Sequence, residues 1–355
     1  MEKVDTLIVG AGLAGSATAR ALARAGRDVV VLERFDIGHT RGSSHGKSRI
    51  FRLAYDDPTF VRMAQAALPL WRELESETGV ELIVTTGGLD CSGDLTRHIR
   101  AVEECGVPYE LLGGPDVSDR FPLMSLPEGT GALFQPDAGI VLADRVVQAL
   151  ISSALAGPAE LHEWEPAREV RVQNGRASVA TDRATYSAEV VVVTAGAWAK
   201  GLLAPLGIEL PVVPTRETVA YFSMADELSV PTIVDWSAAE AVNGSSRPHV
   251  IYSLPSPGDG IKAAEHHAGP PTNPDDVGEV DGASVARISQ WVADRFPKAS
   301  AGPMHAETCI YTNTSDERFI VERHGPVVVG SACSGHGFKF GPLTGKRLAE
   351  LVIDG

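Results

Sequence analysis

The sequence has few cysteines, and none of them is spaced to bind a metal. Its 355 residues contain four, Cys91, Cys105, Cys309 and Cys333, and no two form a C-x-x-C pair. This spacing argues against a zinc site and against a disulfide scaffold, and it is typical of proteins from the reducing cytoplasm. We therefore expect no metal site and a cytoplasmic location.

Long hydrophobic runs are also lacking. Residues 190–199 form the best-populated apolar run, which is too short because a helix needs about 20 apolar residues to cross a bilayer. The apolar residues 7–19 have the character of a signal-peptide core, but Glu2 and Asp5 precede them where a signal peptide carries basic residues. We expect no membrane partner.

Positive charge is scarce as well. The chain carries 31 Lys and Arg against 46 Asp and Glu, a formal net charge of −15 at pH 7. An acidic surface repels phosphate backbones, so we expect no nucleic-acid partner. Hydrophobic residues make up 44% and charged residues 22%, which argues against wholesale disorder, and the length predicts two domains.

A glycine-rich turn lies between two short apolar segments near the start of the chain. Residues 7–9 and 29–32 have the composition of buried strands, and residues 16–24 between them have that of a helix. The turn carries the G-x-G-x-x-G motif of Gly10, Gly12 and Gly15. Such glycines allow a tight turn, the approach of a diphosphate to the backbone, and close helix packing.

Glu33 follows the second strand and completes the unit, because a carboxylate there can bind a ribose diol. The motif alone does not separate FAD from NAD. Residues 41–55, which follow at once, form a Gly/Ser-rich loop with several cations, where an NAD-binding domain would normally continue its parallel sheet. This segment favours FAD as the cofactor.

The rest of the chain predicts a mixed α/β protein in two interleaved parts. The predicted helices cover residues 60–78, 145–155, 283–296 and a segment from about 343. The predicted strands are a hairpin over 169–179, the buried segments 190–193 and 327–330, and a strand-like region over 211–266. We expect a discontinuous FAD-binding domain of residues 1–80, 140–210 and 300–355, and a substrate domain of residues 81–139 and 211–299.

With these patterns in place, the sequence resembles the monomeric sarcosine oxidase family of flavoenzymes, which includes N-methyltryptophan oxidase and related amino-acid oxidases. The likeness extends over nearly the whole chain and is carried by the glycine motif and by residues 42–52, 309–319 and 334–340. The resemblance implies a Rossmann-like FAD domain and a second domain whose antiparallel sheet covers one face of the flavin. It also implies a monomer.

The resemblance assigns roles to particular side chains. Cys309 matches the family cysteine that bonds covalently to the flavin. Arg52 and Lys339 match the pair that holds the substrate carboxylate, since an arginine fork and an ammonium together fix its position. Lys262 matches the lysine that promotes reaction with O2, because a fixed cation stabilises the charge of superoxide.

Further side chains belong to the implied site. His266 is a further catalytic candidate, although the residues between Lys262 and His266 depart from the family pattern and His267 is a competing assignment. Residues implied at the substrate or the reacting part of the cofactor are Arg49, Tyr55, Tyr252 and Tyr311, and those implied to bind the cofactor include Ser43, His45, Arg49, Gly337 and Lys339.

The predicted function is an FAD-dependent oxidase of a secondary amine or of an N-methyl or cyclic amino acid, which gives an imine and hydrogen peroxide. Three alternatives stay open. The protein could be a biosynthetic imine or cyclic imino-acid oxidase, a flavin dehydrogenase that uses an acceptor other than oxygen, or a flavin-binding protein without catalysis. The carboxylate-binding pair argues against the last alternative.

Overall fold

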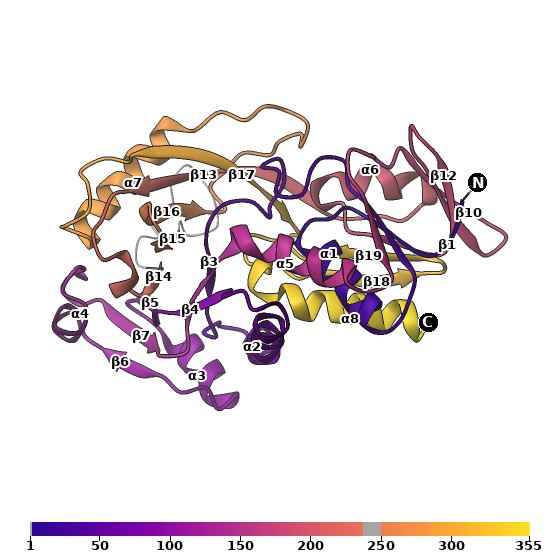
Figure 1. The fold of residues 1–355 in the computed structure, drawn as a ribbon. Helices are drawn as coiled ribbons and strands as arrows, with labels where there is room; N and C mark the ends of the chain where they lie inside the picture. Colours follow the sequence, from indigo (N-terminus) through magenta and orange to yellow (C-terminus); the bar gives the residue numbers. More distant parts are fainter. Residues whose placement is uncertain (1, 237–249) are drawn as a thin grey trace.

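Two large β-sheets lie at opposite ends of the molecule (Figure 1). The structure is a computed structural model and describes residues 2–236 and 250–355. In this part of the chain each large sheet has eight strands, and a smaller sheet has three, β3 (Arg49–Phe51), β8 (Gly139–Val141) and β4 (Ile83–Thr85). A mixed α/β fold with several sheets confirms the predicted fold class.

The first sheet has a parallel core in the order β9-β2-β1-β12-β19, with β18 beside β19 and the hairpin β10–β11 beside the first half of β12. Helices α1, α5 and α8 pack together against it. Because both faces are covered, the central strands are apolar without alternation. The strands are β1 (Glu2–Val9), β2 (Val29–Leu32), β9 (Ala159–His162), β10 (Glu169–Gln173), β11 (Arg176–Ala180), β12 (Thr185–Val193), β18 (Ile320–His324) and β19 (Val327–Ser331).

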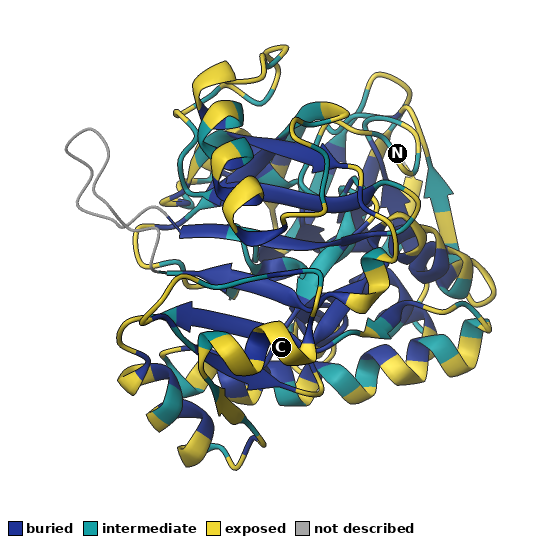
Figure 2. Ribbon diagram, turned by 90° about the vertical axis from the view of Figure 1, so that its left-hand side faces the viewer, coloured by how far each residue is buried: buried dark blue, intermediate teal, exposed yellow. Residues whose placement is uncertain are grey.

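The second sheet runs in the order β17-β13-β16-β15-β14-β5-β7-β6 and is antiparallel except where β14 meets β5. One face packs against α7 through Phe222, Ile261 and Trp291. Most of the strand residues are buried in Figure 2, and the edge strand β6 is the most exposed. The other face borders the site described below. The strands are β5 (Gly88–Ser92), β6 (Glu110–Leu112), β7 (Gly131–Gln135), β13 (Val213–Phe222), β14 (Thr232–Asp235), β15 (Val250–Ser256), β16 (Gly260–His266) and β17 (His305–Asn313).

The helices largely match the sequence predictions, with shifts at their starts. Helix α2 begins at Pro58 rather than at Phe60, because the Asp57 side chain accepts a 2.8 Å hydrogen bond from Thr59 N and caps the helix there. The helices are α1 (Leu13–Arg24), α2 (Pro58–Thr78), α3 (Thr96–Glu104), α4 (Gly114–Arg120), α5 (Ala143–Leu155), α6 (Ala199–Leu203), α7 (Gly282–Arg295) and α8 (Gly341–Ile353). None of those in the described ranges is long and apolar enough to cross a membrane.

The division into two domains stays a prediction. Strand β17 pairs along its length with β13 of the second sheet, so residues 305–313 join that sheet although the expected cofactor domain resumes at residue 300. The strand-like region over 211–266 contains β13 to β16, and its residues 237–249 lie outside the described part of the chain.

Candidate cofactor and substrate site

One cavity of about 1040 Å³ extends from the first sheet to the second. One end is formed where the parallel strands stop, and we name it the glycine-loop end (Gly10, Gly12, Glu33, Ser43 and Thr194). The other is formed by side chains of the antiparallel sheet, of β3 and the residue after it, and of the segment before α8. We name it the cationic end (Arg49, Arg52, Lys262, Cys309 and Lys339). The carboxyl edge of a parallel sheet is where α/β proteins bind their ligands.

The three motif glycines at the glycine-loop end have different constraints. Gly10 has a φ of +97°, which favours glycine, and a Cβ there would lie 2.8 Å from the Thr194 carbonyl oxygen. A Cβ on Gly15 would lie 1.8 Å from the Gly10 carbonyl oxygen, so α1 packs on the turn with no room for a side chain. A Cβ on Gly12 would meet only the Ser44 hydroxyl, at 3.2 Å, and thus the backbone there is open to a ligand.

Glu33 is fixed beside this turn. It is buried, and its carboxylate accepts hydrogen bonds of 2.7 Å from Ala11 N and 2.9 Å from Phe35 N. Within the described residues no side chain caps α1, although Leu13 N donates a 3.1 Å hydrogen bond to the Ser44 hydroxyl. The first turn of α1 therefore offers backbone N–H groups to an anion, next to a held carboxylate.

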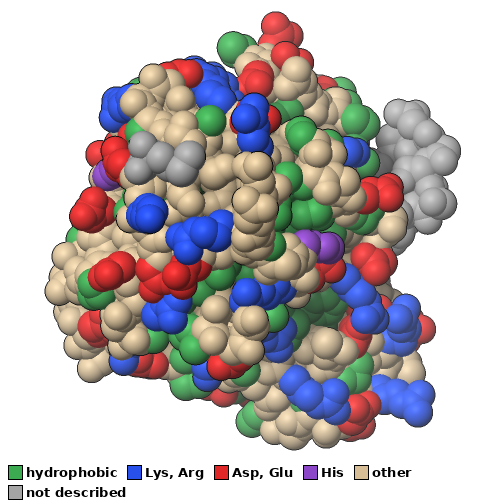
Figure 3. All heavy atoms as spheres, turned by 90° about the vertical axis from the view of Figure 1, so that its right-hand side faces the viewer, with side chains coloured by type: hydrophobic (Ala, Val, Ile, Leu, Met, Phe, Trp, Pro, Cys, Tyr) green, Lys and Arg blue, Asp and Glu red, His purple; other side chains and the backbone are tan. Residues whose placement is uncertain are grey.

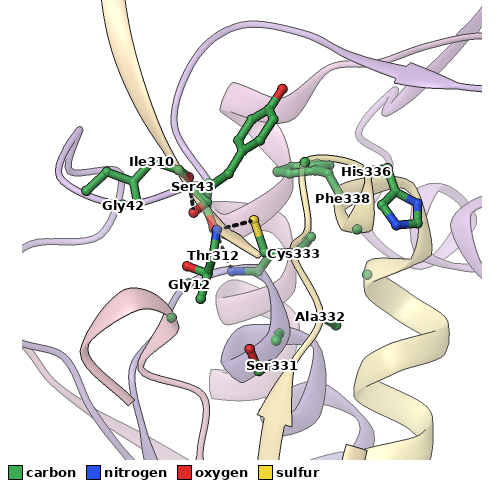
Figure 4. Close-up of a pocket in the computed structure, with 18 of the residues that line it drawn as sticks. Gly12, Gly42, Ser43, Ile310, Thr312, Ser331, Ala332, Cys333, His336 and Phe338 are labelled. Carbon is green, nitrogen blue, oxygen red and sulfur yellow. Dashed lines mark hydrogen bonds between the residues drawn. The ribbon is translucent and has the colours of Figure 1, made fainter. Parts of the chain in front are cut away.

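Arg49 organises the loop that joins the two ends of the cavity. Its guanidinium donates to the Ser43 carbonyl at 3.1 Å, to the Ser48 carbonyl at 2.9 Å and to the His45 carbonyl. The Ser43 hydroxyl donates a 2.5 Å hydrogen bond to the Ile310 carbonyl, which ties this loop to β17 (Figure 4). Arg49 thus acts on loop geometry as well as on charge.

His45, like the packing glycine Gly15, is a predicted cofactor residue that does not line the cavity. Its ring is buried, and neither ring nitrogen has a hydrogen-bond partner within the described residues. Burial and the neighbouring Arg49 lower its pKa to about 4, so the ring is neutral. Gly337, by contrast, lines the cavity at the start of a short 3₁₀ turn (Gly337–Phe340) before α8.

Arg52 and Lys339 both lie close to one aromatic ring at the cationic end. The Arg52 Cζ atom is 4.1 Å and the Lys339 Nζ atom 5.4 Å from the centroid of the Tyr55 ring. Lys339 Nζ donates to the His336 carbonyl at 2.8 Å. Burial, with Arg52 nearby, holds the pKa of Lys339 well below its usual range. A carboxylate is the natural partner for two cations held this close.

Arg52 also has a partner that the sequence did not indicate. Its Nη1 atom donates a 2.8 Å hydrogen bond to the buried carboxylate of Asp90, which also accepts one of 3.2 Å from Trp236 Nε1. Arg52 and Trp236 line the cavity, whereas Asp90 lies behind them. Asp90 therefore fixes the guanidinium from the side away from the cavity.

Alternation along the antiparallel strands gathers the other predicted residues on one face. Lys262 and His266 of β16 share the cavity side with Tyr252 of β15 and with Cys309 and Tyr311 of β17. The Tyr252 and Tyr311 hydroxyls are 3.4 Å apart, and burial raises both of their pKa values. The Tyr55 hydroxyl lies 3.3 Å from His336 Nδ1.

Lys262 and Cys309 are the buried groups of this face whose chemistry matters most. Burial and then Arg49 lower the pKa of Lys262 to about 7. Burial raises the pKa of the Cys309 thiol to about 11. Lys262 is therefore poised between two charge states near neutral pH, whereas the unmodified Cys309 is a thiol.

Behind Lys262 lies a second carboxylate that the sequence analysis missed. The Tyr221 hydroxyl donates a 2.6 Å hydrogen bond to Glu307 Oε1. A Cβ on Gly46 would lie 3.8 Å from each of these two oxygens and 3.2 Å from Arg49 Nη1, so all three surround one point. Because Glu307 precedes Cys309 by two residues on β17, strand alternation could have predicted that it shares the face.

The expectation of no metal site stays a prediction. It was based on cysteine spacing, but the structure brings ligand atoms of His266, His267 and Glu317 within 4.8 Å of one another on the cavity wall. Glu317 lies far from the two histidines in the sequence, so no spacing pattern could have indicated this group. Burial and the neighbouring His267 lower the pKa of His266.

The residues present fit a flavin dinucleotide. The uncapped first turn of α1 and the open backbone at Gly12 suit a diphosphate, and the held carboxylate of Glu33 suits a ribose. The cavity extends from there to a face that carries a cysteine thiol. Its volume of about 1040 Å³ is at the upper end of the range for small-ligand sites.

On the face in Figure 3, acidic and basic side chains are interspersed rather than gathered by sign.

Comparison with known proteins agrees with this fit. Residues 5–351 match the DAO family, described as FAD dependent oxidoreductase. The chain is 32% identical to human peroxisomal sarcosine oxidase over 98% of this chain and 92% of that protein. It is 31% identical to monomeric sarcosine oxidase of a Bacillus species over 99% and 93%, and 26% identical to N-methyl-L-tryptophan oxidase of Salmonella heidelberg over 99% and 95%.

Solved structures give the same result for the fold. NikD, described as an unusual amino acid oxidase essential for nikkomycin biosynthesis, superposes with a TM-score of 0.89 at 28% identity, covering 100% of this chain and 95% of NikD. L-proline dehydrogenase from P. horikoshii superposes with a TM-score of 0.88 at 22% identity, covering 99% and 94%, and supports the fold alone. The chain belongs to the FAD-dependent oxidoreductase family and is a relative of the sarcosine and N-methyltryptophan oxidases.

Proposed function

We propose that the protein is an FAD-dependent oxidase of a secondary amine, an N-methyl amino acid or a cyclic amino acid. The substrate loses a hydride equivalent and a proton to become an imine, and O2 takes up two electrons and two protons to become hydrogen peroxide. The observation that carries this proposal is the pair Arg52 and Lys339 around Tyr55, in the same cavity as the glycine turn.

The binding roles follow from the two ends of the cavity. Gly10, Gly12, Gly15 and Glu33 would hold the nucleotide part of FAD, and Ser43, Arg49 and Gly337 would border its further course, with His45 supporting the loop from behind. When bound, the flavin supplies the acceptor for the hydride and passes two electrons to oxygen. The protein supplies orientation and charge.

Arg52 and Lys339 would bind the substrate carboxylate and so orient the C–H bond that breaks. Two cations fixed by Asp90 and by the His336 carbonyl lose little freedom when the anion arrives. Tyr55, Tyr252, Tyr311 and His266 would form the walls around the rest of the substrate. The Tyr252 and Tyr311 hydroxyls pair with each other and the Tyr55 hydroxyl pairs with His336, so these walls are polar and carry little charge beside the two cations.

Lys262 would act in the reaction with oxygen. Its ammonium group is buried next to the Ser48 carbonyl, at 3.5 Å, and lines the cavity. A positive charge held there stabilises superoxide as the first electron reaches O2, and the protonated amine can also donate a proton to the reduced oxygen. This role separates Lys262 from the carboxylate-binding pair.

We also propose that Cys309 bonds covalently to the flavin. Its Sγ atom lies on the cavity face, near Arg49 and Lys262, whose charges favour the thiolate that the bond requires. Acid denaturation of the yellow protein should leave the flavin with the protein, and Cys309→Ala should release it. Cys333→Ala is the matched control, because that thiol also lines the cavity but accepts a hydrogen bond from Thr312 N (Figure 4). Flavin that washes freely from the wild type would disprove the linkage.

A screen of N-methyl and cyclic amino acids tests the reaction itself. Each compound is scored by flavin bleaching without oxygen and by peroxide formation with oxygen. Bleaching with peroxide supports the oxidase, whereas bleaching without peroxide would favour a dehydrogenase. If no carboxylated amine bleaches the flavin, the proposal is wrong.

A second candidate is a biosynthetic oxidase of a cyclic imine or imino acid. The observation in its favour is the similarity to NikD, at 28% identity over the whole chain. The same screen distinguishes the two, because a ring oxidase would prefer cyclic substrates and produce an aromatic chromophore instead of releasing an aldehyde.

We further propose a monomer that acts in the cytoplasm. The similarity to monomeric sarcosine oxidases supports the first statement, and the four unpaired cysteines, all within the described residues, are consistent with the second. Sedimentation equilibrium at several protein concentrations checks the assembly state, and fractionation of cells that express the chain checks the location.

A further inference from the structure

Two consecutive histidines point into the cavity, which a regular strand does not allow. His266 ends β16, and His267 follows it with a φ of +58°, in the left-handed region that costs energy for a residue other than glycine. Neighbouring side chains on an extended strand point to opposite faces. The left-handed residue instead brings the two imidazole rings to 4.0 Å from each other, both on the cavity wall.

A carboxylate from a distant loop meets the two rings. Glu317, in the loop after β17, also has a left-handed backbone, with a φ of +61°. Its Oε1 atom lies 3.6 Å from His267 Nε2. Two strained residues from separate segments are thus aimed at one place, and strain of this kind gathers at functional sites.

The ring of His266 is held in position by packing. A Cβ on Gly335 would lie 2.6 Å from His266 Cε1 and 2.4 Å from Tyr311 Cε2, so both rings rest directly on the bare backbone at residue 335. The Tyr311 ring also contacts both histidines, with its centroid 5.6 Å from each. The His266 ring is therefore already held in the position from which it faces His267 and Glu317.

We propose that His266, His267 and Glu317 form a binding site for a divalent transition-metal ion such as Zn²⁺. Two imidazole nitrogens and one carboxylate oxygen are a ligand set typical of zinc and its neighbours, whereas magnesium and calcium prefer oxygen alone. Three protein ligands leave a coordination position for water or for a group of another ligand.

The charges around the site determine its affinity for the ion, and its place in the cavity determines how the ion affects activity. Arg52 and Lys339 lie close enough to act on His266 electrostatically, and their charge opposes a second cation, so we expect micromolar rather than nanomolar affinity. An ion held there would stand beside Tyr311 at the cationic end, where we place the amine substrate. Zinc should therefore inhibit the enzyme in competition with that substrate.

Equilibrium dialysis of the holoenzyme against micromolar Zn²⁺ tests the site without reference to activity. The wild type should bind one ion per chain more than His267→Asn and Glu317→Gln do. Asparagine tolerates the left-handed backbone, so His267→Asn removes the imidazole and spares the fold. The matched control is His324→Gln, because His324 forms a similar pair with Glu322, at 2.9 Å, on exposed β18.

The outcomes are distinct. Loss of the ion in the first two variants and its retention in His324→Gln support the site, as does zinc inhibition that EDTA reverses in the wild type alone. Equal binding by the wild type and both variants, or no binding by the wild type, would overturn the proposal. Neither result depends on whether the amine-oxidase function is correct, since dialysis measures the ion alone.

Discussion

The glycine-loop end and the cationic end of the cavity are built in different ways. The first is made mostly of backbone, from a turn, a helix start and the carboxyl edge of parallel strands, and Gly10, Gly12 and Gly15 lie within one short segment. The second is made of side chains from distant parts of the chain. Arg52 pairs with Asp90, 38 residues away, and Lys262 donates to the Ser48 carbonyl, 214 residues away.

This difference teaches which part of the molecule tolerates change. A site made of backbone depends on the absence of side chains. It loses its ligand when a side chain is added where the backbone packs closely. A site made of side chains can lose one group and keep its frame, so that separate functions can be removed one at a time. Each of the following experiments compares the two ends on that basis.

The largest effect should come from Gly15→Ala. The new methyl group would overlap the Gly10 carbonyl oxygen at 1.8 Å, and overpacking of this kind costs about 3 kcal/mol or more of stability. The gain of about 1 kcal/mol in helix propensity does not offset it. We expect protein without flavin and with a lower melting temperature, measured by the ratio of flavin to protein absorbance and by thermal unfolding.

Gly12→Ala is the matched control for that experiment. Its Cβ would meet only the Ser44 hydroxyl at 3.2 Å, which can rotate away, and its φ of −65° suits alanine. It should unfold at nearly the wild-type temperature and bind FAD more weakly, because the methyl group occupies the approach of the diphosphate. Equal behaviour of the two variants would remove the distinction between a packing glycine and a ligand-facing one.

At the cationic end, Arg52→Gln and Lys339→Met should keep the flavin and lose the substrate. Each removes one cation of a buried charge cluster, which we expect to cost about 2–5 kcal/mol in kcat/KM for a carboxylated amine. Steady-state kinetics measures this, with Arg97→Gln as the control, since Arg97 also lines the cavity but is exposed and pairs with Asp56. Loss of flavin from both variants would mean that the two ends are not separable.

The two ends also differ in how far the sequence predicted them. The turn, α1 and β2 follow from local pattern alone, because a glycine motif, helix-forming residues and β-branched apolar residues mark them, although they also pack against distant segments. The three-residue strands β4, β6 and β8 were not predicted, since they form by pairing with strands from other segments of the chain. A strand this short has no periodicity to recognise.

The roles of the side chains at the cationic end were predicted from the family resemblance and not from a local sequence pattern. Arg52, Lys262, Cys309 and Lys339 do line one cavity. The resemblance said nothing of Asp90, which orients Arg52, or of the left-handed backbone that turns His267 inward. Both depend on where distant segments meet, and that is decided by packing of the whole chain.

Lys262→Met tests whether the cationic end itself divides into two functions. Methionine keeps much of the stem and removes the charge that would stabilise superoxide. We expect the activation free energy of the reaction between reduced enzyme and O2 to rise by roughly 3–4 kcal/mol. The rate should therefore fall on the order of a hundredfold to a thousandfold. Flavin reduction by substrate should change far less, and stopped-flow traces of the two half-reactions measure both. An unchanged oxygen rate would assign Lys262 a structural role and favour the dehydrogenase alternative.

The smallest effect should be a shift in pH dependence. Burial and Arg49 lower the pKa of Lys262 to about 7, whereas the charge of Glu307 acts to raise it. Lys262 is charged below that pKa, so the oxygen reaction should be fast at low pH and should slow as the pH rises through about 7. Glu307→Gln removes a negative charge that favours the ammonium form, and the pKa of Lys262 should fall further.

The slowing of the oxygen reaction in Glu307→Gln should therefore begin at a lower pH than in the wild type. We expect a displacement of about one pH unit, equivalent to about 1.4 kcal/mol. Tyr221→Phe, which removes the hydrogen bond to Glu307 and keeps its charge, should shift the profile less. In a Lys262→Met background Glu307→Gln should shift nothing, because the group that titrates is gone. A shift that persists there would mean that Glu307 acts through another group, and that Lys262 does not control the pH dependence of the oxygen reaction.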